Sequence, residues 1–201
     1  MSDGRNNIKT WLFNPHYFIA GWQALVLGLI VILASAYVGS LSGNQFDGLL
    51  DIHFLPPAPL ATLIEEAFFD WFIFAVLIYF GGRMVSGSHI RVLDVLGTQA
   101  LSRFPSLISV TVLLFTKPGM MRYYQNPNHF GANIPDMATF WGGMIVVILM
   151  LAWMLQLMIQ AFAVSCNVDL RGMKERAVFW GAVLLGEIIT KEVFGRIYHI
   201  F

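Results

Sequence analysis

Eight ionisable side chains lie inside stretches of the sequence that are otherwise apolar. A charge at the centre of a lipid bilayer costs at least ~2.5–3.5 kcal/mol, so each side chain is expected to face the interior of a helix bundle and to meet a partner there. A buried set of carboxyl and cationic groups can bind a proton, a small cation, a polar solute or a lipid headgroup. Five of the eight are acidic and three are basic: Glu65, Glu66, Asp70, Glu187, Glu192, Arg103, Lys191 and Arg196.

The spacing of these residues predicts which of them share a helix face. Glu66 and Asp70 are four residues apart, and two like charges on one face disfavour joint ionisation. We therefore expect that one of them is protonated, or that both share Arg103 or Lys191. Glu187 precedes Lys191 by four residues, which is the favourable order for an ion pair on a helix.

Two readings of these residues follow from the energetics. Arg196 lies near the end of its stretch and can extend to the boundary of the membrane, so the candidate intramembrane cluster consists of the other seven residues. One reading makes the cluster a polar cavity with Glu66, Asp70, Glu187 and Lys191 at its core. The other makes it a set of contacts that hold helices together, although such contacts average only ~0.6 kcal/mol each. Both readings remain open at this point.

The composition explains which elements must position these groups. Apolar residues make up 57% of the chain and charged residues 12%, against roughly 45–50% and about 25% in soluble domains. The formal net charge is zero, which argues against nucleic acid as a partner. The single cysteine, Cys166, excludes an internal disulfide and a CxxC metal or redox site, and the five histidines are scattered. We expect no metal, no cofactor and no catalytic residue.

Five apolar stretches are long enough to cross a bilayer, which requires about 20 residues per helix. We therefore predict one all-α membrane domain over residues 1–201, a polytopic bundle of five transmembrane helices. The first and fourth stretches contain no charged residue, and the third contains Pro105, which removes a backbone hydrogen bond and can kink its helix. The predicted spans cover residues 17–39, 60–80, 96–115, 138–164 and 177–197.

The distribution of Lys and Arg over the connections predicts the orientation. The N-terminal side and the two short connections are basic, whereas the longer connections contain only Lys117 and Arg122. This bias places the N-terminus in the cytoplasm, and an odd number of spans places the C-terminus outside. Four apolar residues are expected to hold the first long connection against the membrane interface: Phe46, Leu49, Leu50 and Phe54. The basic side carries Arg5, Lys9, Arg83, Arg91, Arg171, Lys174 and Arg176.

Three segments of the sequence form a recognisable pattern: Gly81-Gly82-Arg83 with the following Arg91-Val92-Leu93-Asp94-Val95-Leu96-Gly97 and Pro105, then Phe13-Asn14-Pro15, and the basic turn from Arg171 to Ala177. In these segments the chain resembles the Yip1-domain family of five-span membrane proteins. The resemblance implies five spans along essentially the whole chain. Eukaryotic members have a long cytosolic N-terminal region and act in vesicle trafficking with small GTPases. Only about 15 residues precede the first span here, so we expect no small GTPase partner; the short form resembles bacterial members, which implies the bacterial inner (cytoplasmic) membrane.

The expected function is that of an integral membrane protein that transports or handles a small solute, ion or lipid through the charged cluster. The alternative is a non-catalytic scaffold, or trafficking-type protein, that binds other membrane proteins. We expect no enzymatic activity, because the sequence shows no nucleophile and base or metal constellation. The expected partners are the lipid bilayer and either a second copy or other membrane proteins. Small residues four apart, such as Ala24 and Gly28, permit close approach between helices.

Overall fold

The computed structural model describes residues 8–45, 50, 53–54, 59–125 and 134–198. These residues form an almost entirely helical molecule, with one short antiparallel pair of strands in the first long connection. Arg5, which contributes to the predicted basic side, lies outside the described residues. The elements in chain order are α1 (Ile8–Phe13), the 3-10 helix η2 (Pro15–Tyr17), α2 (Gly21–Ser42), β1 (Asn44–Gln45), β2 (His53–Phe54), α3 (Leu60–Val85), α4 (Val92–Leu101), α5 (Phe104–Gln125), α6 (Ile134–Cys166) and α7 (Met173–Tyr198).

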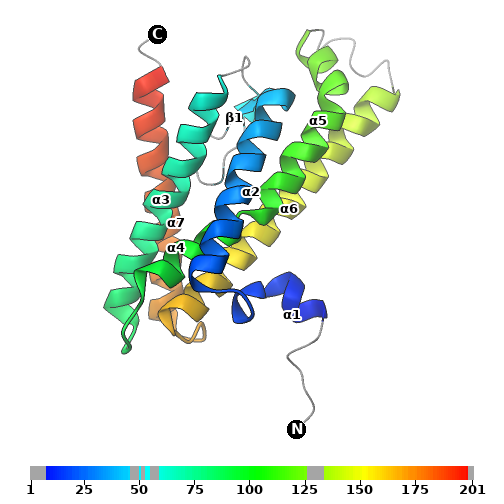
Figure 1. The fold of residues 1–201 in the computed structure, drawn as a ribbon. Coiled ribbons are helices and arrows are strands. Elements are labelled where there is room, and N and C mark those ends of the chain that lie inside the picture. Colours follow the sequence, from blue (N-terminus) through cyan, green and yellow to red (C-terminus); the bar gives the residue numbers. More distant parts are fainter. Residues whose placement is uncertain (1–7, 46–49, 51–52, 55–58, 126–133, 199–201) are drawn as a thin grey trace.

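The long helices lie side by side, and the chain runs back and forth along them between the two ends of the bundle (Figure 1). α2 packs against α3, α4 and α5, while α3 packs against α7 and α5 against α6. α1 lies across the lower end of the bundle in Figure 1, and α7 runs toward the upper end. The first described helix and the C-terminal end of α7 therefore lie at opposite ends of the bundle.

Three helical segments among the described residues are long and apolar enough to cross a membrane. They are Gly21–Ser42, Val92–Pro118 and Met137–Cys166. Since three such helices lie in one chain, the protein has the features of a multi-pass integral membrane protein. α3 and α7 have 26 residues each, a length of about 39 Å, but they carry the acidic residues of the candidate cluster.

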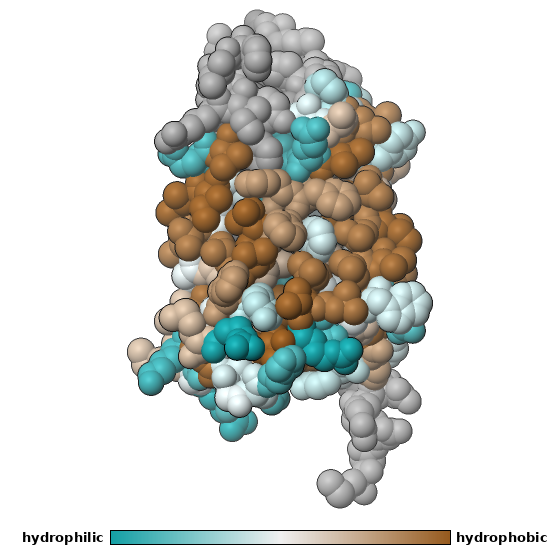
Figure 2. All heavy atoms as spheres, turned by 60° about the vertical axis from the view of Figure 1, so that its left-hand side comes forward, coloured by the Kyte–Doolittle hydropathy of each residue, from teal (hydrophilic) through white to brown (hydrophobic). Residues whose placement is uncertain are grey.

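Apolar side chains lie across the middle of the face that Figure 2 shows, and hydrophilic ones gather at the lower end of this face. On α2 and α6 the exposed apolar side chains include Ile30, Ile145, Ile148 and Leu149, each more than half exposed. Exposed aliphatic side chains in this number are expected where lipid, and not water, covers the surface.

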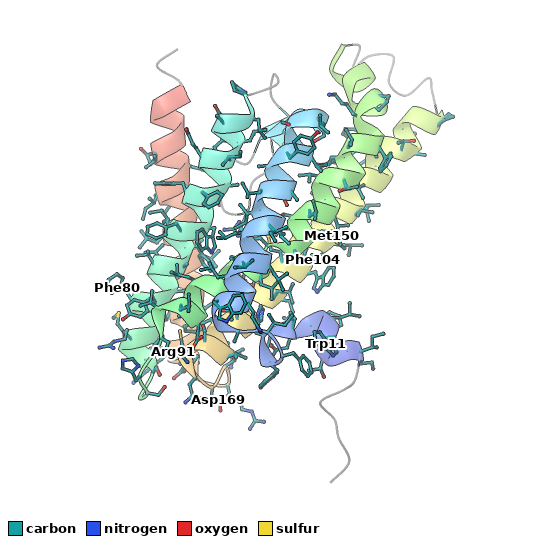
Figure 3. All side chains as sticks on the ribbon, viewed as in Figure 1. Trp11, Phe80, Arg91, Phe104, Met150 and Asp169 are labelled. Atoms are coloured by element: carbon teal, nitrogen blue, oxygen red, sulfur yellow. The ribbon has the colours of Figure 1, made fainter. Side chains whose placement is uncertain are left out.

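Basic residues gather at one end of the bundle, as the orientation argument predicts. Figure 3 places Trp11 of α1, Arg91 before α4 and Asp169 after α6 at the same lower end. Arg83 in the last turn of α3 and Arg171, Lys174 and Arg176 around the start of α7 belong to these connections. At the other end Lys117 donates a hydrogen bond to the carbonyl oxygen of Leu41.

The third predicted span, residues 96–115, is not one continuous helix. α4 ends at Leu101 and α5 begins at Phe104, and the two residues between them, Ser102 and Arg103, form a tight turn. The backbone N–H of Arg103 donates to the carbonyl oxygen of Ala100, three residues back, where an α-helix would use the fourth. Pro105 falls in the first turn of α5, where its missing N–H leaves no hydrogen bond unmade. We call this break the Ser102–Arg103 joint.

α2 and α4 approach each other closely because small residues face one another. A Cβ atom on Gly28 of α2 would lie 2.5 Å from the backbone carbon of Ala100, and a Cβ on Gly97 of α4 would overlap the carbonyl oxygen of Gly21. Ala24 and Ala100 are fully buried in the same contact. The small residues of α2 therefore pack inside one molecule, against α4.

The largest apolar core lies between α3, α6 and α7. Phe74, Phe162 and Phe179 are fully buried there, and the rings of Phe74 and Phe179 meet edge to face with centroids 6.1 Å apart. Leu50 packs against this core from the connection between α2 and α3. Leu50 of this connection therefore contacts the bundle, whereas Phe46 and Leu49 lie outside the described residues.

Candidate functional site

The charged residues of α3, α7 and the Ser102–Arg103 joint lie at similar depths in the bundle. Asp70 is ten residues from the first residue of α3, about 15 Å along the helix, and Glu187 is about 21 Å from the start of α7. These helices run in opposite directions between the same two ends (Figure 1). Both carboxyl groups therefore lie near the middle of helices that are about 39 Å long.

Arg103 connects these two helices. Its side chain is buried, with 9% of its surface exposed, and its guanidinium interacts electrostatically with the carboxylates of Asp70 and Glu187. The joint thus presents a cation from α4 and α5 to an acidic residue of α3 and another of α7. Because the surroundings are apolar, these attractions are stronger than the same pairs would be in water.

Glu187 has two further partners. Its Oε1 atom lies 3.1 Å from Nζ of Lys191, and its Oε2 atom accepts a hydrogen bond of 3.0 Å from the backbone N–H of Leu50. The pair with Lys191 has the predicted spacing of four residues. The bond from Leu50 was not predicted, because the pattern of side chains does not show where a backbone N–H will donate.

The seven candidate residues differ sharply in burial. Glu66 and Asp70 are 1% exposed, the side chain of Glu187 is 21% exposed and that of Lys191 is 47% exposed. Glu65 and Glu192 have exposed side chains on the same two helices. The charged cluster, as we use the term below, consists of Glu66, Asp70, Arg103, Glu187 and Lys191.

Trp71 fixes the position of α3 beside the joint. Its indole Nε1–H donates a hydrogen bond of 3.1 Å to the carbonyl oxygen of Leu96 in α4, and its ring packs with Ile32 and Ala100. Because Trp71 follows Asp70 directly, this bond ties the helix that carries the buried carboxyl to the helix that precedes Arg103.

A second polar group lies between the N-terminal segment, α4 and α6. His16 is 1% exposed, and its Nε2 atom lies 3.2 Å from the carbonyl oxygen of Leu157 and 3.3 Å from Oγ of Ser102. The amide of Asn14 donates to Oε1 of Gln160, and the amide of Gln99 donates to the carbonyl oxygen of Met158. We call this group the His16 cluster; its residues are Asn14, His16, Gln99, Ser102 and Gln160.

The sequence contains a weak signal for the His16 cluster. Pro15 occupies the first position of η2, where proline starts a helical turn, and this turn directs His16 into the bundle. Without the fold, five scattered histidines give no reason to select this one. The contact of Gln160 with Asn14 joins the N-terminal segment to α6.

Burial lowers the pKa of His16 to about 4 from its ordinary value of 6.5, because the apolar surroundings disfavour the imidazolium ion. Between about pH 4 and 6.5 the unfolded chain therefore binds more protons at this residue than the folded protein does. We expect the free energy of unfolding to rise with pH across this window, and to lose about 3 kcal/mol from His16 as the pH falls from 7 to 4.

The measurement is the temperature of unfolding in detergent at pH 7 and pH 4. The drop between the two pH values should be smaller for His16→Gln than for the native chain, because the variant has no imidazole to protonate. His89→Gln is the matched control, since His89 is an exposed residue. Equal drops in the native chain and in His16→Gln would show that His16 does not resist protonation.

The described residues contain no group of three or more His, Cys, Asp or Glu side chains that could hold a metal ion. Their chemistry at this site is that of carboxyl, guanidinium, ammonium, imidazole and amide groups. No family model matches the chain, and no curated protein and no solved structure matches it either.

Proposed function

We propose that this chain crosses the membrane five times, with its N-terminus in the cytoplasm, and that the charged cluster binds a proton or a small cation within the bundle. α3 and α7 supply the two spans beyond the three apolar ones, and α3 buries Glu66 and Asp70 inside the bundle. The resemblance to short members of the Yip1-domain family supports this topology and a bacterial inner membrane as the location.

The balance of charge in the charged cluster is the observation that carries the proposal. Glu66, Asp70 and Glu187 provide three carboxyl groups, and Arg103 and Lys191 provide two cationic groups. If all five were ionised, the cluster would hold a net charge of −1 in an apolar setting, which is costly. A proton or a monovalent cation removes this charge.

The gradient of burial indicates how such a ligand would be exchanged. Glu66 and Asp70 are almost fully buried, Glu187 is partly exposed and Lys191 is about half exposed. The cluster therefore extends from the interior of the bundle to its surface. A group that titrates in the interior can exchange its proton or ion along this series of polar side chains.

The test is reconstitution of the chain in lipid vesicles, with proton flux and the flux of alkali and ammonium cations measured under an imposed gradient. We expect native protein to carry at least one of these fluxes. Glu66→Gln and Asp70→Asn should each reduce it about tenfold or more, which corresponds to the loss of about 1.4 kcal/mol of interaction with the ion.

Glu65→Gln is the matched control, because Glu65 neighbours Glu66 on α3 but has an exposed side chain. It should leave the flux unchanged. Unfolding temperatures of all three variants separate loss of fold from loss of function. The proposal fails if native protein carries no flux, or if folded Glu66→Gln and Asp70→Asn carry as much as the native chain.

A scaffold that binds other membrane proteins is the second candidate. One observation favours it: the interactions of Arg103 and the indole of Trp71 all join different helices, as contacts that only stabilise a bundle would. A scaffold predicts no flux in any vesicle, with lower unfolding temperatures for Glu66→Gln and Asp70→Asn.

A further inference from the structure

Three buried acceptor atoms belong to the His16 cluster. Among the described residues, Nδ1 of His16, Oδ1 of Asn14 and Oε1 of Gln99 are buried side-chain atoms without a hydrogen-bond partner. His16 and Gln99 are each only 1% exposed. Buried polar atoms are satisfied in the great majority of native proteins, so three in one cluster point to a bound molecule.

The hydrogen bonds around His16 determine which ring nitrogen carries the proton. The carbonyl oxygen of Leu157 can only accept, so Nε2 of His16 is the N–H donor. The hydroxyl of Ser102 already donates to the carbonyl oxygen of Thr98, at 2.8 Å. In the neutral ring Nδ1 is then a bare acceptor, and the amide oxygens of Asn14 and Gln99 are acceptors as well.

The three residues that carry these acceptors all hydrogen-bond to one turn of α6. The ring of His16 binds the carbonyl oxygen of Leu157, Gln99 binds that of Met158, and Asn14 binds the side chain of Gln160. A molecule in this place must donate hydrogen bonds. It must also be small and neutral, since the same apolar surroundings that disfavour the imidazolium ion of His16 disfavour any other cation.

We infer that Asn14, His16 and Gln99 form a buried binding site for a small neutral hydrogen-bond donor, of the size of water or ammonia. The donor bridges Nδ1 of His16 to the amide oxygen of Asn14 or Gln99, beside α6. A bridge to Gln99 links η2 to α4. This site is separate from the charged cluster, and the inference does not depend on the proposed function.

Magnetic resonance of the full chain in lipid nanodiscs, labelled with ¹⁵N in the histidine rings, tests the site. The His16 signals are assigned by their loss in His16→Gln. Near pH 7 we expect the Nε2–H tautomer, with the Nδ1 signal shifted toward that of a hydrogen-bonded acceptor. A second spectrum, in ammonium chloride at alkaline pH against the same concentration of sodium chloride, distinguishes the two ligands.

A correlation from water protons to Nδ1 that ammonium chloride leaves unchanged identifies water. A further shift of Nδ1 that saturates with ammonium chloride alone identifies ammonia. Both results support the site. A signal typical of a bare Nδ1 with neither response, or a proton on Nδ1 itself, overturns it.

Substitutions test the role of the amide oxygens. Gln99→Met, and independently Asn14→Ala, should move the Nδ1 signal toward that of a bare acceptor. Gln156→Met is the matched control, because Gln156 lies on the same helix as Leu157 with an exposed side chain. If neither Gln99→Met nor Asn14→Ala shifts the signal in a folded protein, these residues do not hold the molecule and the assignment of the site is wrong.

Discussion

Replacement of Arg103 by Met is expected to destabilise the bundle by about 3–5 kcal/mol, because it removes one partner of a buried ionic group and leaves the others. Asp70 and Glu187 would then lack the guanidinium with which both interact electrostatically. The measurement is the free energy of unfolding in detergent, or the unfolding temperature where unfolding is irreversible.

Two further variants show whether the charge itself is responsible. Arg103→Lys keeps a cation at the joint and should recover part of the stability, although an ammonium group cannot reproduce the fork of the guanidinium. Adding Asp70→Asn to Arg103→Met should cost less than the two single changes together. Arg91→Met is the matched control, since the side chain of Arg91 is 72% exposed. Comparable losses of unfolding free energy in Arg91→Met and Arg103→Met would show that the interactions of Arg103 with the acidic residues do not stabilise the bundle.

Substitution of Gly28 by Val is the second change with a large expected effect. The new Cβ would lie 2.5 Å from the backbone carbon of Ala100 and 2.5 Å from the backbone nitrogen of Leu101. Backbone atoms cannot turn away as a side chain can, so α2 and α4 must separate. We expect a loss of about 3 kcal/mol or more, the upper end for an overpacked core.

Gly181→Val is the matched control for this prediction. Gly181 lies within α7, and a Cβ there would meet no atom within 4 Å. The control therefore measures the intrinsic cost of the β-branched residue in a helix, without a collision. The two unfolding temperatures should differ by several degrees, and the lower one should belong to Gly28→Val. Equal values would show that α2 and α4 are not in close contact in the membrane.

The sequence predicted the positions of the long helices better than it predicted the break between α4 and α5. A bilayer imposes a length on every apolar stretch, and four predicted spans, the first, second, fourth and fifth, coincide with α2, α3, α6 and α7 to within a few residues. The joint at Ser102 and Arg103 is different. Pro105 indicates a disturbance, but the pattern of apolar residues runs through it without interruption, so only the fold shows where the backbone turns.

The candidate site was predicted in part. The spacing of Glu187 and Lys191 predicted their ion pair, because both lie on one helix and local geometry decides the contact. Arg103 could not be matched to Asp70 and Glu187 in advance, because that contact depends on how three helices pack. Two further features depend on segments that lie outside the long helices. The backbone N–H of Leu50 reaches Glu187, and His16 is buried, because these segments pack against the bundle.

The Ser102–Arg103 joint relates ligand binding at the charged cluster to the angle between α4 and α5. Arg103 is carried by the bend between α4 and α5, so a change in the angle of the bend moves its guanidinium relative to the acidic residues of α3 and α7. A proton or cation that binds more tightly at one angle must favour that angle, and the angle must in turn set the affinity, by the same factor. If the charged cluster binds a proton or cation as proposed, the bend is the place where binding would change the relative orientation of α4 and α5.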